Sequence, residues 1–199
     1  MKLKKLLSGL IAISIFTASF TGCTKTVDNT SKSSTEISTS NDSTEKNESD
    51  TQIVIDSIGR EIEIPNPVTA SVVANAYNTE IINAINALDS VIGVDYNIYQ
   101  DKESWKNKFT EDMVIGKSQK ELNYEKIIEL NPQVLILTGN GSYEEAESQL
   151  APFGIKVIVC DAYYTDMFEE NCTLLGKIFG KEQEAKELSD YFMDKLDYI

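Results

Sequence analysis

The sequence predicts an α/β fold, in which a parallel β-sheet is covered by helices on both faces. Three observations predict it. Short apolar runs, bounded by Gly, Pro, Asn or Asp, recur along residues 68–161. Segments with helical apolar spacing lie between most of these runs. The runs are apolar almost without interruption, which is typical of parallel strands buried on both faces. An N-terminal β-hairpin and a long C-terminal helix complete the predicted fold.

Residues 1–22 have the pattern of an export signal. A basic start, MKLKK, precedes the apolar segment 6–20, which is too short for a permanent membrane span. The following Thr21-Gly22-Cys23 resembles a bacterial lipobox, with Phe20 at a position where Leu, Val or Ile is usual. The resemblance implies that Cys23 is diacylated and anchors the protein to the extracytoplasmic face of the cell membrane. An ordinary cleavable signal peptide with an unmodified cysteine is the alternative.

Residues 23–51 comprise this cysteine and a predicted tether. Residues 24–50 contain no aromatic residue and only two large aliphatic residues, Val27 and Ile37. Such a segment cannot bury enough apolar surface to offset the entropy that its chain would lose on folding. The sequence therefore predicts a disordered link, with an ordered domain from Gln52 onward.

The ordered part begins with a predicted hairpin over residues 53–64, because apolar and polar residues alternate on both sides of DSIGR. Five predicted strands follow, over residues 68–75, 90–95, 113–116, 133–139 and 155–161. The predicted helices cover residues 78–88, 123–130, 142–153, 165–180 and 181–199, with a short helix or irregular crossover over residues 101–109. Asn78 or Thr79 is the predicted N-cap of the first of these helices.

The last predicted helix carries an apolar stripe but no helix-ending residue. We expect the final side chains of this stripe to lack a partner element downstream. The stripe consists of Ala185, Leu188, Phe192, Leu196 and Ile199.

The charge and residue composition exclude several classes of function. The chain has 32 acidic and 18 basic residues and a net charge of −14, which disfavours nucleic acid and anionic lipid as partners. It has no histidine, so Ser-His and Cys-His catalysis are excluded, and the commonest metal ligand is missing. We predict no catalytic residue, no metal site and no cofactor. Cys160 and Cys172 either form a disulfide or pack as buried free thiols, and the second is the simpler interpretation.

Five segments resemble, in order and spacing, the N-terminal lobe of class III substrate-binding proteins of ABC importers, those for iron–siderophore, haem and cobalamin. The resemblance implies a Rossmann-like lobe over residues 52–180 and the start of an inter-lobe helix over residues 181–199. It also implies a second lobe, so we expect this chain to be a fragment, an interrupted reading frame or half of a split protein. The segments are IDSIGREIEIP, YNTEIINAINALDSVIGVD, NYEKIIELNPQVLIL, LAPFGIKVIVCD and LLGKIFGKEQEAKEL.

The resemblance implies a ligand crevice at the carboxyl ends of the strands, where ligands generally bind to open α/β sheets. The segment TGNGS would form one wall of it, since the glycine spacings of phosphate-binding loops are absent. Tyrosines there could stack on a flat ligand or lie half-buried at loop edges, and Trp105 could line the pocket or serve as a packing anchor. The matching positions are Asn75, Tyr77, Asp95, Tyr96, Tyr99, Lys117, Ser118, Thr138, Gly139 and Asn140.

Glu125 corresponds to a family glutamate that docks on the permease. A carboxylate in the first turn of a helix is favoured by the helix dipole, so a helix-start glutamate without a partner is the alternative. Lys117 is the only cation in the matched crevice loops, which disfavours a strongly anionic ligand unless the second lobe supplies the charge. These loops contain no tryptophan that could pack against the corrin ring, so cobalamin is not supported as the ligand.

These features predict a solute-binding lipoprotein that captures a metal chelate of the iron–siderophore or haem type and delivers it to an ABC permease. The lipid anchor would be its only contact with the membrane. Two alternatives stay open. One is a structural or adhesive surface lipoprotein, which would bind a partner protein and no small molecule. The other is an α/β enzyme acting on a nucleotide or sugar in the same crevice.

Overall fold

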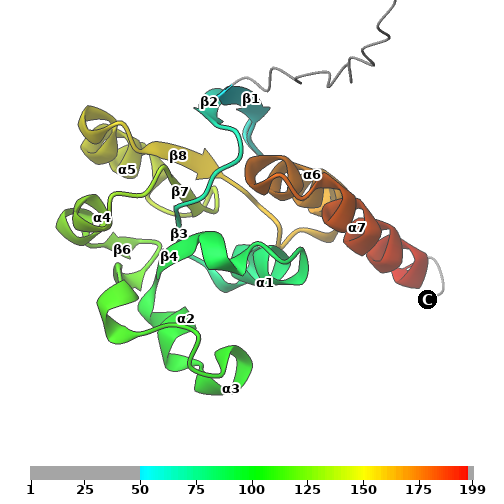
Figure 1. Cartoon of the computed structure of the whole chain (residues 1–199), viewed down its shortest axis with the longest axis horizontal. Coiled ribbons are helices and arrows are strands. Elements are labelled where there is room, and N and C mark those ends of the chain that lie inside the picture. Colours follow the sequence, from blue (N-terminus) through cyan, green and yellow to red (C-terminus); the bar gives the residue numbers. More distant parts are fainter. Residues whose placement is uncertain (1–49, 197–199) are drawn as a thin grey trace, which may run out of the picture. The chain divides into compact units, whose positions relative to one another are not determined.

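A four-stranded parallel sheet forms the centre of the computed structural model, which describes residues 50–196 (Figure 1). The strands lie in the order β4-β3-β7-β8. This arrangement confirms the predicted α/β fold with a parallel sheet. The four strands are β3 (Ser71–Val73), β4 (Val91–Val94), β7 (Val134–Leu137) and β8 (Lys156–Val159).

Helices cover both faces of this sheet, as predicted. On β7, Val134 and Ile136 face one hydrophobic cluster, and Leu135 and Leu137 face the other. The first cluster is closed by α1 and α6 and the second by α4 and α5, which lie on opposite sides of the sheet (Figure 1). The α-helices are α1 (Ala76–Ala84), α2 (Tyr96–Gln100), α3 (Lys102–Trp105), α4 (Tyr124–Leu130), α5 (Tyr143–Leu150), α6 (Phe168–Phe179) and α7 (Glu182–Leu196). Single turns of 3-10 helix are η1 (Leu88–Ser90), η2 (Glu111–Met113), η3 (Ala151–Phe153) and η4 (Thr165–Met167).

The predicted N-terminal hairpin is confirmed. Strands β1 (Thr51–Ile55) and β2 (Glu61–Pro65) pair antiparallel, with Val54 opposite Ile62. Val54 and Ile64 are buried in the first hydrophobic cluster, whereas Ile53 and Ile55 are exposed. The hairpin therefore attaches to the α/β unit through one face of its two strands.

The predicted strand at residues 113–116 is wrong. Val114 contributes only one parallel bridge to Val94, and the chain then forms a separate antiparallel pair, β5 (Gly116–Ser118) with β6 (Glu121–Leu122). Gly116 has a φ of +148°, and a Cβ there would lie 2.3 Å from the carbonyl oxygen of Glu121. Only glycine can make this turn, so the strand cannot continue along the sheet.

The boundaries of the first helix also differ from the prediction. Helix α1 begins at Ala76, two residues before the predicted start, and its N-cap is Asn75 rather than Asn78 or Thr79. It ends at Ala84 rather than Leu88, and Asn86 then adopts a φ of +59°. A left-handed residue cannot continue an α-helix, so the apolar spacing outlasts the helix.

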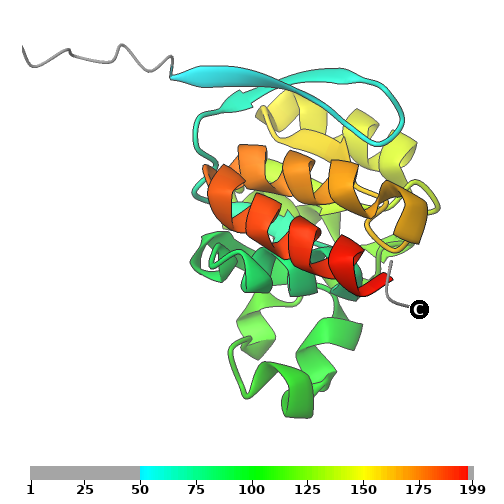
Figure 2. The ribbon, with the colours of Figure 1, turned by 90° about the vertical axis from the view of Figure 1, so that its right-hand side faces the viewer.

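Helices α6 and α7 form an antiparallel helical hairpin, with the two helices side by side in Figure 2. Gly176 permits the close approach, because a Cβ at this position would lie 2.5 Å from the Cβ of Ala185. Ala185 is buried, and the ring of Phe192 stacks on Phe168 with 4.0 Å between centroids. These residues of the stripe therefore have a partner in α6, which precedes them in the chain, whereas the expectation concerned an element downstream and is not tested by this contact. Ile199 lies outside the described residues.

Cys160 and Cys172 are buried free thiols, so the disulfide alternative is not realised. Burial raises the pKa of Cys172 to about 12 and also raises the pKa of Cys160, which makes both thiols inert. Within residues 50–196, no helix combines the length and apolar character needed to cross a bilayer. The predicted signal, Cys23 and nearly all of the predicted tether lie outside the described residues.

Candidate functional site

A cavity of about 360 Å³ lies at the carboxyl ends of the sheet strands. It is bordered by the segments that follow β3, β4 and β7, by the β5–β6 turn and by the loop after β8. Parallel strands end at one edge of the sheet, so segments far apart in the sequence meet there. The lining residues are Ala74, Asn75, Ala76, Tyr77, Asp95, Asn97, Ser118, Gln119, Thr138, Asn140 and Tyr163.

Asn75 lines this cavity and carries an unpaired side-chain amide nitrogen. It exposes 7 % of its surface, and its Oδ1 caps α1 by accepting a hydrogen bond of 3.0 Å from the backbone N–H of Asn78. Its Nδ2 is buried and has no hydrogen-bond partner. Buried polar groups without partners are rare in folded proteins, because each costs about 1–3 kcal/mol. The free amide donor is thus available for a ligand oxygen.

Asp95 places a carboxylate in the same cavity. It exposes 4 % of its surface and caps α2, with its Oδ1 accepting a hydrogen bond of 3.0 Å from the backbone N–H of Ile98. Burial raises the pKa of Asp95, and hydrogen bonds from Ile98 and Asn97 oppose the increase. Among the ion pairs of the described residues, none involves Asp95.

The segment TGNGS forms a wall of the cavity and is held by side-chain contacts. Thr138 Oγ1 lies 2.8 Å from Gln119 Oε1 and 2.7 Å from Asn140 Oδ1, and Gln119 Nε2 donates to Asn140 Oδ1 at 2.8 Å. The backbone N–H of Thr138 also donates to Gln119 Oε1 at 3.0 Å. Gln119 thereby fixes the wall against the β5–β6 turn, and no row of free backbone N–H groups is arranged as in a phosphate loop.

Two tyrosines form an aromatic edge of the cavity. The rings of Tyr77 and Tyr163 lie 5.9 Å apart between centroids, and Tyr77 is 57 % exposed. A hydrogen bond with Tyr164 raises the pKa of Tyr163 to about 12. Tyr163 therefore stays protonated at neutral pH and offers a ring face and a hydroxyl rather than a tyrosinate.

The structure brings six of the ten predicted ligand residues together around the cavity. They are Asn75, Tyr77, Asp95, Ser118, Thr138 and Asn140. Their roles toward a ligand remain predictions.

The other four predicted residues lie outside the cavity lining. Lys117 is directed to solvent, with 74 % of its side chain exposed, and it pairs with Glu121 at 3.5 Å. Tyr96 is exposed on α2, and Tyr99 packs beneath Lys102, whose Nζ lies 3.5 Å from the ring centroid. Gly139 donates its backbone N–H to Asp161 Oδ1 at 2.7 Å, so it serves the loop rather than the cavity. Trp105 is buried against Phe109, which identifies it as a packing anchor.

Three lining residues with polar side chains, Asn97, Gln119 and Tyr163, were missed by the sequence analysis. Asn97 follows the predicted Tyr96, but this segment is the helix α2 rather than a loop. Gln119 follows the predicted Ser118, but it lies in the β5–β6 turn, which was not predicted. Tyr163 follows the last strand of the sheet, and the rule that ligands bind at strand ends could have identified it.

Glu125 is exposed in the first turn of α4, where Asn123 caps the helix by accepting a hydrogen bond from the backbone N–H of Lys126 at 3.0 Å. No ion pair involving Glu125 occurs among the described residues. Its carboxylate is therefore available to a basic partner, but nothing in the fold assigns that partner.

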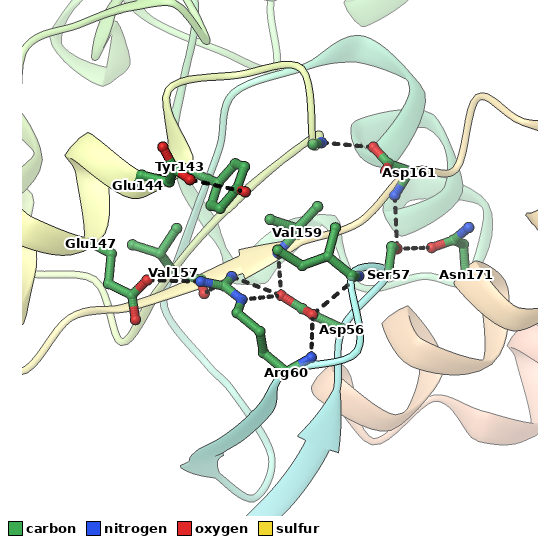
Figure 3. A network of polar contacts seen from close by, with 12 residues as sticks. Asp56, Ser57, Arg60, Tyr143, Glu144, Glu147, Val157, Val159, Asp161 and Asn171 are labelled. Carbon is green, nitrogen blue, oxygen red and sulfur yellow. Dashed lines mark hydrogen bonds and ion pairs between the residues drawn. The ribbon is translucent and has the colours of Figure 1, made fainter.

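A polar network fixes the hairpin turn to the sheet beside this site (Figure 3). Asp56 Oδ2 accepts hydrogen bonds of 2.9 and 2.7 Å from Arg60 Nε and Nη2. Ser57 Oγ donates to Asn171 Oδ1 at 2.6 Å and accepts from the backbone N–H of Asp161 at 3.0 Å. The single arginine of the chain is thus committed to the hairpin rather than to the cavity.

Comparison with known proteins gives one family and a set of related folds. A family model described as periplasmic binding protein matches residues 72–199. No curated protein matches. A periplasmic solute binding protein from Veillonella parvula is 19% identical, with a TM-score of 0.65 over 74% of this chain and 46% of that one.

Two further solved structures are similar at comparable levels. The petrobactin-binding protein YclQ from Bacillus subtilis is 22% identical, with a TM-score of 0.60 over 74% of this chain and 52% of that one. A periplasmic heme binding protein from Pseudomonas aeruginosa is 22% identical, with a TM-score of 0.57 over 66% of this chain and 45% of that one. This chain spans about half the length of the solved structures that it matches. At these identities the likeness shows the shared fold.

Proposed function

Since the chain belongs to the periplasmic binding protein family, we propose that it captures a metal chelate of the iron–siderophore or haem type and delivers it to the permease of an ABC importer. The family consists of solute-binding proteins that act outside the cytoplasm. The chelate is the cargo, and binding rather than turnover is the proposed activity. A structural or adhesive surface protein and an α/β enzyme are the rival functions.

The unpaired amide of Asn75 in the crevice is the observation that carries this proposal. Its Nδ2 is buried and has no partner, and Asn75 is one of the residues that line the cavity at the strand ends. A surface used only for adhesion or structure has no need to leave a buried donor unsatisfied beside an open cavity. The tyrosine pair beside it offers a face on which a flat ligand can stack.

The chelate class is supported by the names of two similar structures, one a petrobactin-binding and one a heme binding protein. The described residues contain no group of three acidic or cysteine side chains that could hold a bare metal ion. A metal would therefore arrive already chelated, with the protein recognising the organic groups around it.

Fluorescence titration tests capture directly. We expect the full chain to bind a ferric hydroxamate, a ferric catecholate or hemin saturably. The iron-free chelators should not bind at the same concentrations. Failure of all ferric chelates, hemin and cobalamin would refute the proposal. Hydrolysis of a nucleotide or sugar by the pure protein would favour the enzyme instead, and capture of a partner protein alone would favour adhesion.

Delivery would involve docking through Glu125. Glu125→Arg reverses the charge of an exposed side chain outside the cavity lining, so we expect loss of radiolabelled chelate uptake with unchanged chelate affinity. Glu129→Arg, at the other end of α4 and also exposed, is the matched control and should support uptake. Equal loss of binding and uptake in the Glu125 variant would contradict a docking role.

The lipid anchor would attach the protein to the extracytoplasmic face of the cell membrane. Cys23 lies outside the described residues, so this part of the proposal depends on the sequence pattern. We expect radiolabelled palmitate to enter the wild-type chain and not the Cys23→Ala variant, which should be released from the membrane fraction. A wild-type chain without label would leave the ordinary signal peptide as the explanation.

A further inference from the structure

The charges around the crevice indicate what kind of chelate it can hold. Of the residues that line the cavity, Asp95 is the only one whose side chain is charged at neutral pH. It exposes 4 % of its surface, and within residues 50–196 no Lys or Arg forms an ion pair with it. The described face of the crevice is therefore negative, with no cation to balance it.

Arg60 and Lys117 are committed to ion pairs, and Lys120 of the β5–β6 turn is exposed and does not line the cavity. Arg60 binds Asp56 at 2.7 Å and Glu147 at 2.8 Å. Lys117, in the β5–β6 pair, is exposed and binds Glu121. Neither lies among the residues that line the cavity. A ligand carboxylate or catecholate entering this face would meet a fixed negative charge in a partly dehydrated site, where Coulomb repulsion is stronger than in water.

The polar and aromatic groups of the crevice specify the rest of the ligand. The Asn75 amide requires an oxygen acceptor, since its Nδ2 is buried and unpaired. The Asp95 carboxylate accepts hydrogen bonds, so it favours an ammonium or a neutral N–H or O–H group. The Tyr77 and Tyr163 rings offer contact to an uncharged surface.

We propose that this face of the crevice selects uncharged or cationic chelates of the ferric hydroxamate class and discriminates against polyanionic catecholate and carboxylate chelates. The inference rests on the proposed capture of a metal chelate and specifies its chemistry. Hydroxamate chelates of ferric iron present amide and hydroxamate oxygens to a donor such as Asn75. They carry no net negative charge, since three hydroxamates neutralise the ferric ion.

A matched series of ligands isolates charge from shape. Ferrioxamine B carries one positive charge on its terminal amine, its N-acetyl derivative carries none, and its N-succinyl derivative carries one negative charge. All three share one ferric trihydroxamate core. For the full chain, fluorescence titration should give the highest affinity for the cation and the lowest for the anion, with a span of about tenfold.

Two isosteric variants locate the source of the preference. Asp95→Asn keeps an N-cap for α2 and removes the charge, so the span should shrink to less than about twofold. Asp101→Asn makes the same change at the exposed N-cap of α3, where the side chain accepts a hydrogen bond from the backbone N–H of Ser104 at 3.0 Å. This control should retain the span, which separates the effect of Asp95 from the field of the whole acidic chain.

The possible results separate this inference from the proposed function. Equal affinities, a reversed order or an equal collapse of the span in both variants would overturn the inference and leave chelate capture standing. Binding of a ferric tris-catecholate but of none of the three hydroxamates would do the same. Failure of every ferric chelate, hemin and cobalamin would overturn the proposed function, and the inference would fall with it.

Discussion

Asp56 and Asp95 are equally buried, with 4 % of each residue exposed, but their surroundings differ. Asp56 lies in the hairpin turn, where its carboxylate accepts five hydrogen bonds, including two from the guanidinium of Arg60. Asp95 lies in the crevice, where it accepts hydrogen bonds from its own helix N-terminus and, among the described residues, has no cationic partner.

The difference separates a structural site from a binding site. Every oxygen of Asp56 is satisfied, so its burial fixes the DSIGR turn against β8 (Figure 3). The crevice instead retains a lone carboxylate and the unpaired amide of Asn75. Buried polar groups without partners lower the stability of the fold, and they occur mainly at functional sites.

Asp56→Ala should have the largest effect on stability. It would leave Nε of the partly buried Arg60 guanidinium and the backbone N–H groups of Ile58 and Val159 without their acceptor. Removing one partner of a buried ion pair costs about 3 kcal/mol or more, so urea denaturation should show a loss of this size. Chelate affinity of the molecules that remain folded should not change.

Glu147→Ala provides the control for this variant. Glu147 binds the outer side of Arg60, but 58% of its side chain is exposed. An exposed ion pair contributes about 0–1 kcal/mol, so the loss of stability should be much smaller than for Asp56→Ala. Equal losses in the two variants would show that the hydrogen bonds inside the turn do not matter, and the comparison would fail.

Asn75→Asp tests the crevice side of the comparison. An aspartate keeps the N-cap of α1 through its oxygen but replaces the Nδ2 donor with a second oxygen. We expect an affinity loss for ferric hydroxamates of about tenfold, equivalent to about 1.4 kcal/mol, and a loss of stability because a second carboxylate is buried beside Asp95. Asn123→Asp makes the same exchange at the exposed N-cap of α4 and should leave affinity unchanged. Unchanged affinity in Asn75→Asp would show that the free amide does not contact the ligand.

The sheet could be predicted from the sequence because its strands are buried on both faces. Val134 to Leu137 are all fully buried, so the apolar run itself identifies the strand. The strand expected at residues 113–116 shows where this argument ends. Its apolar side chains fit a strand, but the backbone of Gly116 turns away at a φ of +148°, and hydropathy contains no information about φ.

The sequence predicts which segments lie at the cavity, but it does not predict which of their side chains point into it. The family resemblance, which implies a crevice at the strand ends, gave Asn75, Asp95 and Thr138, and all three line the cavity. It also selected Lys117, whose side chain points to solvent, because the direction of a side chain depends on the unpredicted β5–β6 pair. Gln119 was missed for the same reason.

Ser57→Ala tests whether the hairpin and the crevice are independent. Ser57 Oγ joins Asn171 to the backbone of Asp161, and the Asp161 side chain holds the N–H of Gly139 beside the crevice wall. Loss of these hydrogen bonds should cost about 1 kcal/mol of stability. We expect chelate affinity to stay within about twofold, since Gly139 keeps its own bond to Asp161. A tenfold loss of affinity would show that the turn positions the binding wall. Ser148→Ala, at an exposed serine of α5, should change neither quantity.

Asp95→Asn should have a small effect on stability, with a sign opposite to that of Asp56→Ala and Ser57→Ala. Burial raises the pKa of Asp95 above its ordinary value of 3.8, so between these two pKa values the folded protein binds more protons than the unfolded chain. Stability therefore falls as the pH rises through this window, and the full cost is present at neutral pH. Asparagine caps α2 as well as aspartate does and carries no charge, so the variant should be more stable at neutral pH by less than about 1 kcal/mol.

The pH dependence of that gain makes the test specific to Asp95. Urea denaturation of both proteins at a series of pH values should show the advantage of Asp95→Asn shrinking as the pH falls through the raised pKa, because wild-type Asp95 then becomes neutral in the fold. Asp101→Asn should show no such gain, since hydrogen bonds from Ser104 hold the pKa of Asp101 below its ordinary value. A loss of stability in Asp95→Asn at neutral pH would mean that the Asp95 carboxylate stabilises the fold, as the Asp56 carboxylate does. The crevice would then hold no charge reserved for a ligand, and the contrast between the two aspartates would disappear.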